Sequence, residues 1–86
     1  MNIHVSNLSL NLIDNDLRKM FSVYGEVTTA VIVRDRNNGR SKGTAFVDMI
    51  NDAQGAQAVM MLNNTSLDGR KISVSEIEYS PGRHKN

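Results

Sequence analysis

The sequence of 86 residues contains no cysteine, a single proline and few aromatic residues (5%). Without cysteine the chain can form no disulfide bond, no thiolate metal site and no cysteine nucleophile, and this composition is compatible with a reducing compartment. The net charge is also small, a formal +1 at pH 7, because ten basic residues stand against nine acidic ones. The overall charge therefore says little about a binding partner.

The composition that remains is typical of one small folded domain. Hydrophobic residues make up 40% of the chain and charged residues 22%, which argues against wholesale disorder. A domain of this size buries only roughly 60–65% of the surface of its unfolded chain, so its core should be small. We expect an ordered domain over residues 1–79 and a flexible basic tail over residues 80–86.

The first residues of the sequence show no sign of a targeting segment. The first apolar run, residues 3–5, follows Met1 directly, and no basic region with a long apolar stretch precedes it. We therefore expect a cytoplasmic protein that does not engage a membrane.

Two segments have the spacing of amphipathic helices. Apolar residues recur at i, i+3, i+4 and i+7 in residues 14–24, with Gly25 as the predicted stop, and again in residues 52–62. The first stripe consists of Leu17, Met20, Phe21 and Tyr24. Gly55 in the second stripe lowers helix propensity by roughly 1 kcal/mol relative to alanine, so we expect close packing there to require it.

Four further segments have the pattern of strands, which are residues 3–6, 27–33, 44–50 and 72–75. The predicted order is therefore β-α-β-β-α-β, the split βαβ or ferredoxin-like arrangement of the α+β class. In this arrangement two helices cover one face of a four-stranded antiparallel sheet and leave the other face open.

The positive charge is concentrated in the connection between the second and third predicted strands. This segment holds four basic residues and one acidic residue, a net charge of +3. The basic residues are Arg34, Arg36, Arg40 and Lys42, and the turn signal Asn37-Asn38-Gly39 lies between them. A solvated loop and a contact surface for an anionic partner both explain such a segment.

Two short motifs resemble those of the RNA-recognition domain family. Residues 42–49, Lys-Gly-Thr-Ala-Phe-Val-Asp-Met, resemble its eight-residue ribonucleoprotein motif, and five of the seven defined positions match. Residues 3–8, Ile-His-Val-Ser-Asn-Leu, resemble its shorter motif with the aromatic replaced by histidine. The similarity spans residues 2–77, and the chain resembles free-standing, single-domain bacterial members of this family. It implies an RNA-binding module.

The resemblance implies a platform for stacked bases on the open face, formed here by His4, Thr44 and Phe46. Core packing is the alternative for Phe46, as for most phenylalanines. Strand alternation favours the outward position, because Ala45, Val47 and Met49 would then form the inward row. The row of opposite parity is Thr44, Phe46 and Asp48.

The two other platform positions depart from the family pattern. His4 is either an ordinary exposed histidine or a side chain that stacks on a base and forms hydrogen bonds. Thr44 has no π face, so one stacking contact should be missing and binding should be weaker. Neither histidine lies in a cluster with metal-ligand spacing, and we expect no metal and no cofactor.

The remaining predicted contacts follow from the resemblance and from strand parity. Lys42 matches the family position that meets backbone phosphate, and Arg34, Arg36 and Arg40 extend that contact along the loop. Ser73 and Ser75 are weaker predicted contacts to base edges. Val31 and Val33 would leave an apolar strip on the open face, which suits either bases or a protein partner.

The sequence therefore predicts a domain that binds single-stranded RNA, and single-stranded DNA more weakly, as a monomeric RNA chaperone or post-transcriptional regulator. A protein-interaction module on the same fold is the alternative. We expect no enzymatic activity, since the sequence contains no phosphate-cradling glycine loop and no catalytic constellation.

Overall fold

A computed structural model describes residues 1–77, so the predicted tail over residues 80–86 lies outside the described residues. The predicted β-α-β-β-α-β order is confirmed, with one short additional hairpin before the last strand. The elements are β1 (Asn2–Ser6), α1 (Asp14–Ser22), β2 (Val27–Arg34), β3 (Ser41–Met49), α2 (Asp52–Leu62), β4 (Ser66–Leu67), β5 (Arg70–Lys71) and β6 (Ser73–Ile77).

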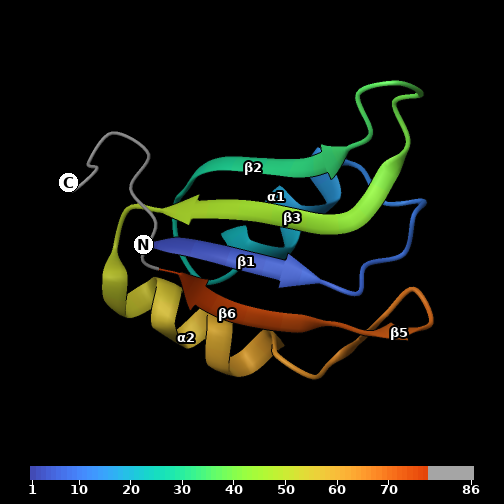
Figure 1. Cartoon of the computed structure of the whole chain (residues 1–86). Coiled ribbons are helices and arrows are strands. Elements are labelled where there is room, and N and C mark those ends of the chain that lie inside the picture. Colours follow the sequence, from blue (N-terminus) through green and yellow to red (C-terminus); the bar gives the residue numbers. More distant parts are fainter. Residues whose placement is uncertain (78–86) are drawn as a thin grey trace, which may run out of the picture.

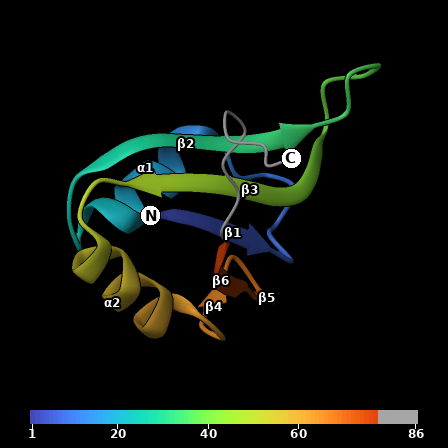
Figure 2. The same ribbon diagram turned by 60° about the vertical axis from the view of Figure 1, so that its left-hand side comes forward.

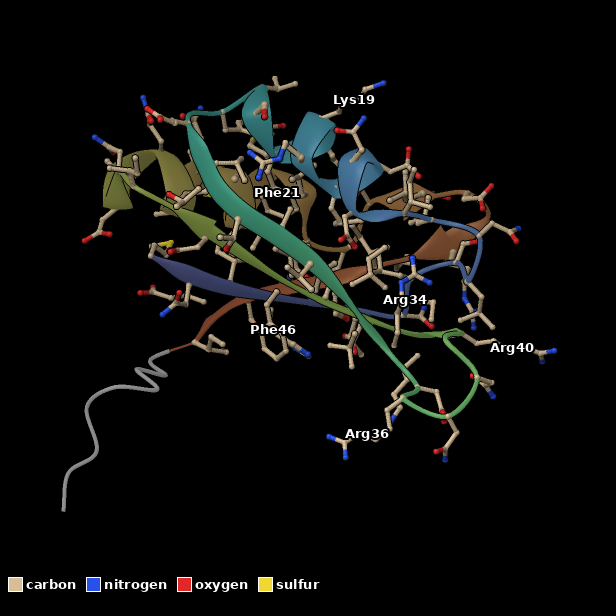
Figure 3. All side chains as sticks on the ribbon, turned by 90° about the horizontal axis from the view of Figure 1, so that it is seen from above. Lys19, Phe21, Arg34, Arg36, Arg40 and Phe46 are labelled. Atoms are coloured by element: carbon tan, nitrogen blue, oxygen red, sulfur yellow. The ribbon has the colours of Figure 1, made fainter. Side chains whose placement is uncertain are left out.

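The main sheet has four strands in the order β2-β3-β1-β6, and each neighbouring pair is antiparallel (Figure 1). Both helices lie on one side of this sheet, and the other side carries no helix (Figure 3). The predicted α+β fold with one open face is therefore confirmed. Within residues 1–77, neither helix is long and apolar enough to span a bilayer.

The core lies between the sheet and the two helices. Alternate residues of each central strand point toward the helices, so Ile3, Val5, Ala45, Val47 and Met49 are each at most 1% exposed. This arrangement confirms the predicted inward row of β3. The helices add Leu17, Phe21 and Ala58 to the fully buried side chains, and Ile72 is buried between β5 and β6.

Helix α1 is shorter than predicted. It ends at Ser22, two residues before Tyr24, although Tyr24 still packs against the core. Gly25 does not end the helix in a left-handed conformation, since its φ is not positive. A Cβ at this position would instead overlap the side chain of Gln54 on α2, so glycine here permits a close approach.

Side chains of α1 cover the outer edge of β2. An oxygen of the Asp14 carboxylate accepts a hydrogen bond from the Ile32 amide at 2.9 Å, and the Arg18 guanidinium donates to the Val27 carbonyl at 2.8 Å. These bonds pair backbone groups that an edge strand otherwise leaves open to another chain.

Helix α2 has the predicted bounds, and its start is fixed by a side-chain cap. The Asn51 side-chain oxygen accepts a hydrogen bond from the Gln54 amide at 2.9 Å. Gly55 is buried, and a Cβ there would lie 2.6 Å from the sulfur of Met1. The predicted close packing is therefore present, with the Met1 side chain as the near neighbour.

Candidate nucleic-acid interface

The centre of the open face is a row of side chains that crosses all four strands. Phe46 on β3 pairs with Val31 on β2 and with His4 on β1, and His4 pairs in turn with Ser75 on β6. The Phe46 side chain is 45% exposed, and the residues on either side of it in sequence are buried. The predicted outward position of Phe46 is therefore confirmed (Figure 3).

The two rings of this row lie side by side. The centroids of the His4 and Phe46 rings are 5.1 Å apart, and the ring planes are tilted by 46°. Aromatic pairs at this separation attract each other, so each ring limits the movement of the other. The pair forms a small preorganised π surface in the middle of a helix-free face, the geometry on which unpaired bases stack.

The polar predicted residues surround this pair. Thr44 lies on β3 two positions before Phe46 and is half-buried. On β6, Ser75 is paired with His4, and Ser73 is paired with Ser6 at the end of β1. The structure therefore brings His4, Thr44, Phe46, Ser73 and Ser75 together on one face.

A second polar row was not predicted as part of the site. Asp48 follows Phe46 by two positions on the same face, and it pairs with Asn2 on β1 and with Thr29 on β2. Its carboxylate lies 3.7 Å from the Met1 ammonium group. The strand parity that placed Phe46 outward also placed Asp48 outward, and this was the signal available in the sequence.

The loop between β2 and β3 is shaped by Asp35. Its carboxylate accepts hydrogen bonds from the amides of Asn37 and Asn38 at 2.7 and 3.3 Å, and its amide donates to the Arg40 carbonyl at 2.8 Å. Gly39 has a φ of 73°, a left-handed conformation that glycine adopts without strain. The loop extends beyond the end of the sheet (Figure 2).

The loop arginines do not all lie on the same side of the sheet. Arg36 reaches toward the side that carries Phe46, whereas Arg34 lies nearer the helices (Figure 3). The Arg34 guanidinium also donates to the Gly39 carbonyl at 3.2 Å, so this side chain stabilises the loop itself. All four basic residues of this segment are exposed, so they differ in direction and not in burial. Of the four predicted phosphate contacts, Arg34 is therefore the least favourably placed.

An antiparallel four-stranded sheet with rings on its helix-free face and a basic hairpin at one end is typical of domains that recognise RNA. The chain belongs to the RNA recognition motif family, whose sequence model matches residues 3–73.

Individual relatives agree with this assignment. The chain is 41% identical over 76 residues to the putative RNA-binding protein RbpD of Nostoc sp., and the match covers 88% of this chain and 81% of that protein. Several other curated relatives match at 39–41% identity, and the chain spans less than half of their length.

Solved structures show the same fold. The crystal structure of RNA Binding Protein PG1 superposes with a TM-score of 0.91 at 37% identity, and the match covers 94% of this chain and 98% of that one. The Sxl-lethal protein/RNA complex superposes with a TM-score of 0.81 at 33% identity, and it covers 86% of this chain and 46% of that one.

Proposed function

We propose that this chain binds single-stranded RNA on the open face of its sheet, with bases stacked on Phe46 and His4. Membership of the RNA recognition motif family supports RNA as the ligand, as do the RNA-binding names of relatives and a structural neighbour solved with RNA. The proposed role is that of a monomeric RNA chaperone or post-transcriptional regulator in the cytoplasm, without a catalytic step.

The observation that carries this proposal is the exposure of a phenyl ring at the middle of a sheet. Phe46 is 45% exposed and lies 5.1 Å from the His4 ring, although burial of such a ring in the core would stabilise the fold. A base stacked on an aromatic side chain contributes about 1–3 kcal/mol to binding. A ring left in solvent beside a second ring is therefore explained by a ligand with π faces.

Phosphate contacts complete the proposed site. Lys42 and Arg40 are exposed near the start of β3, and Arg36 reaches toward the Phe46 side of the sheet. Each phosphate that a cation neutralises on a single strand contributes about −0.7 to the slope of log affinity against log salt. Ser73, Ser75 and Thr44 supply hydroxyl groups beside the rings, where they can bond to base edges or riboses.

Titration of short RNAs into isotope-labelled protein tests the proposal. Pyrimidine-rich and purine-rich oligonucleotides should shift the NMR signals of His4, Lys42 and Phe46, and signals on the outer faces of the helices should stay unchanged. Absence of shifts at these three residues at millimolar RNA would reject RNA binding on this face.

Exposed apolar side chains favour a second function, binding to another protein. Val31 is 52% exposed on the open face and pairs with Phe46, which is 45% exposed, so the two form a small apolar patch. Exposed apolar patches often mark protein interfaces. If protein binding is the main function, the Val31→Ser variant should lose affinity for the protein partner. The wild type and the variant should then both have negligible affinity for RNA.

A further inference from the structure

Three connections meet at one end of the main sheet, and one of them, the β4–β5 hairpin, carries two basic residues outside the site described above. The β1–α1 connection, the β2–β3 loop and the β4–β5 hairpin all lie at the end toward which β1 points (Figure 1). Arg70 and Lys71 form β5 of this hairpin. The turn between β4 and β5 uses Asp68 and Gly69, whose φ values are 51° and 82°.

The hairpin is held beside β1 by a specific contact. Asn7, directly after β1, donates from its side-chain amide to the Lys71 carbonyl at 2.8 Å. Asn7 itself has a φ of 60°, a conformation that asparagine tolerates better than most residues. Together with the pairing of Ser6 and Ser73, this bond fixes the backbone of Lys71 next to the end of the open face.

Alternation along the chain places the Lys71 side chain toward the open face. Ile72 and Val74 are 0% and 2% exposed and pack toward the helices. Lys71 therefore shares the parity of Ser73 and Ser75, both of which lie on the open face, and it is exposed. The hydroxyl groups of Ser73 and Ser75 on β6 are thus preceded along the chain by the ammonium group of Lys71 on β5.

Acidic and basic residues of the domain gather at opposite ends of the sheet, along the direction of the strands. The opposite end of the sheet, where β1 begins and β3 ends, carries four acidic residues, which are Glu26, Asp48, Asp52 and Glu76. The Met1 ammonium group pairs with Asp48 and Asp52 there, at 3.7 and 3.3 Å, and leaves an acidic excess. The end with the three connections has a basic excess, because Asp35 and Asp68 stand there against six basic residues, which are Arg34, Arg36, Arg40, Lys42, Arg70 and Lys71. A phosphate backbone is repelled by the first end and attracted by the second.

Lys42 and Lys71 lie on opposite sides of β1. Lys42 is on β3, one neighbour of β1, and Lys71 is on β5, which leads directly into β6, the other neighbour of β1. Strands β3 and β6 are about 10 Å apart, two strand spacings. A single strand whose bases rest on the His4 and Phe46 rings spans β1 and β3. If it continues across β1, its backbone reaches the side that carries Lys71.

We propose that Lys71 is a second phosphate-binding contact, so that bound RNA crosses the sheet from the Lys42 side to the Lys71 side with its backbone along the basic end. This inference rests on the proposed RNA-binding function and assigns one further contact to it. It also predicts that the bases point from this end toward the Phe46 row and Asp48.

The Lys71→Gln variant tests this contact, with Lys19→Gln as the matched control. Lys19 has the same charge and lies on α1, on the helical side of the sheet (Figure 3). Affinity for a uniform single-stranded RNA is measured by fluorescence anisotropy over a series of salt concentrations. Lys71→Gln should reduce the magnitude of the salt slope by about 0.7. Lys19→Gln should leave the slope unchanged.

A second measurement identifies the phosphate. One phosphate at a time in the oligonucleotide is replaced by a neutral methylphosphonate, and each modified RNA is titrated into wild type and Lys71→Gln. At one position near an end of the bound segment, the modification should weaken binding to wild type but not to Lys71→Gln.

The outcomes separate the two proposals. The first outcome is that wild type binds RNA with shifts at Phe46, that Lys71→Gln keeps the wild-type salt slope, and that every methylphosphonate weakens binding to both proteins equally. In that case the Lys71 contact is wrong and the proposed function stands. If wild type does not bind RNA at all, both are wrong.

Discussion

The two phenylalanines of this chain occupy the two faces of the sheet and have opposite environments. Phe21 on α1 is 0% exposed and lies in the core between helix and sheet, whereas Phe46 on β3 is 45% exposed on the helix-free face (Figure 3). Burial of a large apolar side chain stabilises a fold by roughly 1.5–3 kcal/mol. The helical face therefore accounts for stability, and the open face leaves the same type of side chain available to a ligand.

This comparison shows how a small domain separates folding from binding. Alternation along β3 sends Ala45, Val47 and Met49 into the core and leaves Thr44 and Phe46 outside it. A substitution on one face should change the free energy of unfolding, and a substitution on the other should change affinity. The following substitutions test that separation.

The largest effect is expected from Phe21→Ala. Removal of a fully buried phenyl ring leaves a cavity and should lower the free energy of unfolding by about 3–5 kcal/mol. Denaturant unfolding followed by circular dichroism measures this loss. A loss below about 1 kcal/mol would mean that the helical face does not provide the main core.

Phe46→Ala should lower the affinity for RNA and leave the free energy of unfolding nearly unchanged, the opposite of Phe21→Ala. Affinity for single-stranded RNA should fall by about 1–3 kcal/mol through loss of a stacked base. The free energy of unfolding should change little, because the ring is half in solvent. Phe46→Tyr is the matched control, since it keeps a ring of similar size and should keep most of the affinity. Unfolding of Phe46→Ala would instead show that the ring belongs to the core.

Thr44→Phe should strengthen binding. Thr44 lies on the same face of β3 as Phe46. An aromatic ring there offers another stacking surface, which should add about 1–3 kcal/mol to the binding free energy. Thr44→Val serves as the comparison, because it keeps the branched shape and removes the hydroxyl group. If Thr44→Phe weakens binding as much as Thr44→Val does, the hydroxyl contact matters more than stacking at this position.

Combined Lys42→Ala and Arg40→Ala should mainly change the salt dependence. Loss of two phosphate contacts should reduce the magnitude of the log–log salt slope by about 1.4. The measurement is RNA affinity across a range of salt concentrations, with Lys19→Ala as the control on the helical side. An unchanged slope would contradict the phosphate role of these two residues.

Much of the fold and of the central site could be predicted because both follow from periodicity. The period of two in β3 distinguished Phe46 from its buried neighbours, and the helical stripe of α1 identified Leu17 and Phe21 as core. The bounds of α2 were also predicted, and its apolar stripe ends with the helix at Leu62.

Other features depend on contacts between residues distant in sequence. The predicted role of Gly25 as a helix stop was wrong, because α1 already ends at Ser22 and the φ of Gly25 is not positive. Glycine there instead permits the close approach of Gln54 on α2. The β4–β5 hairpin and its attachment through Asn7 have no periodic signal. The direction of Arg34 was available from strand alternation, because Arg34 shares the parity of the buried Ala30 and Ile32, but the prediction grouped the four basic residues by charge alone.

The central claim, that Phe46 and not Phe21 meets the RNA, can be tested in one titration. Fluorinated phenylalanine labels two positions in this chain, because the sequence contains two phenylalanines. In ¹⁹F NMR, with the signals assigned by Phe46→Tyr, single-stranded RNA should shift and broaden the Phe46 signal and leave that of Phe21 in place. A Phe46 signal that stays unchanged at saturating RNA would contradict the account.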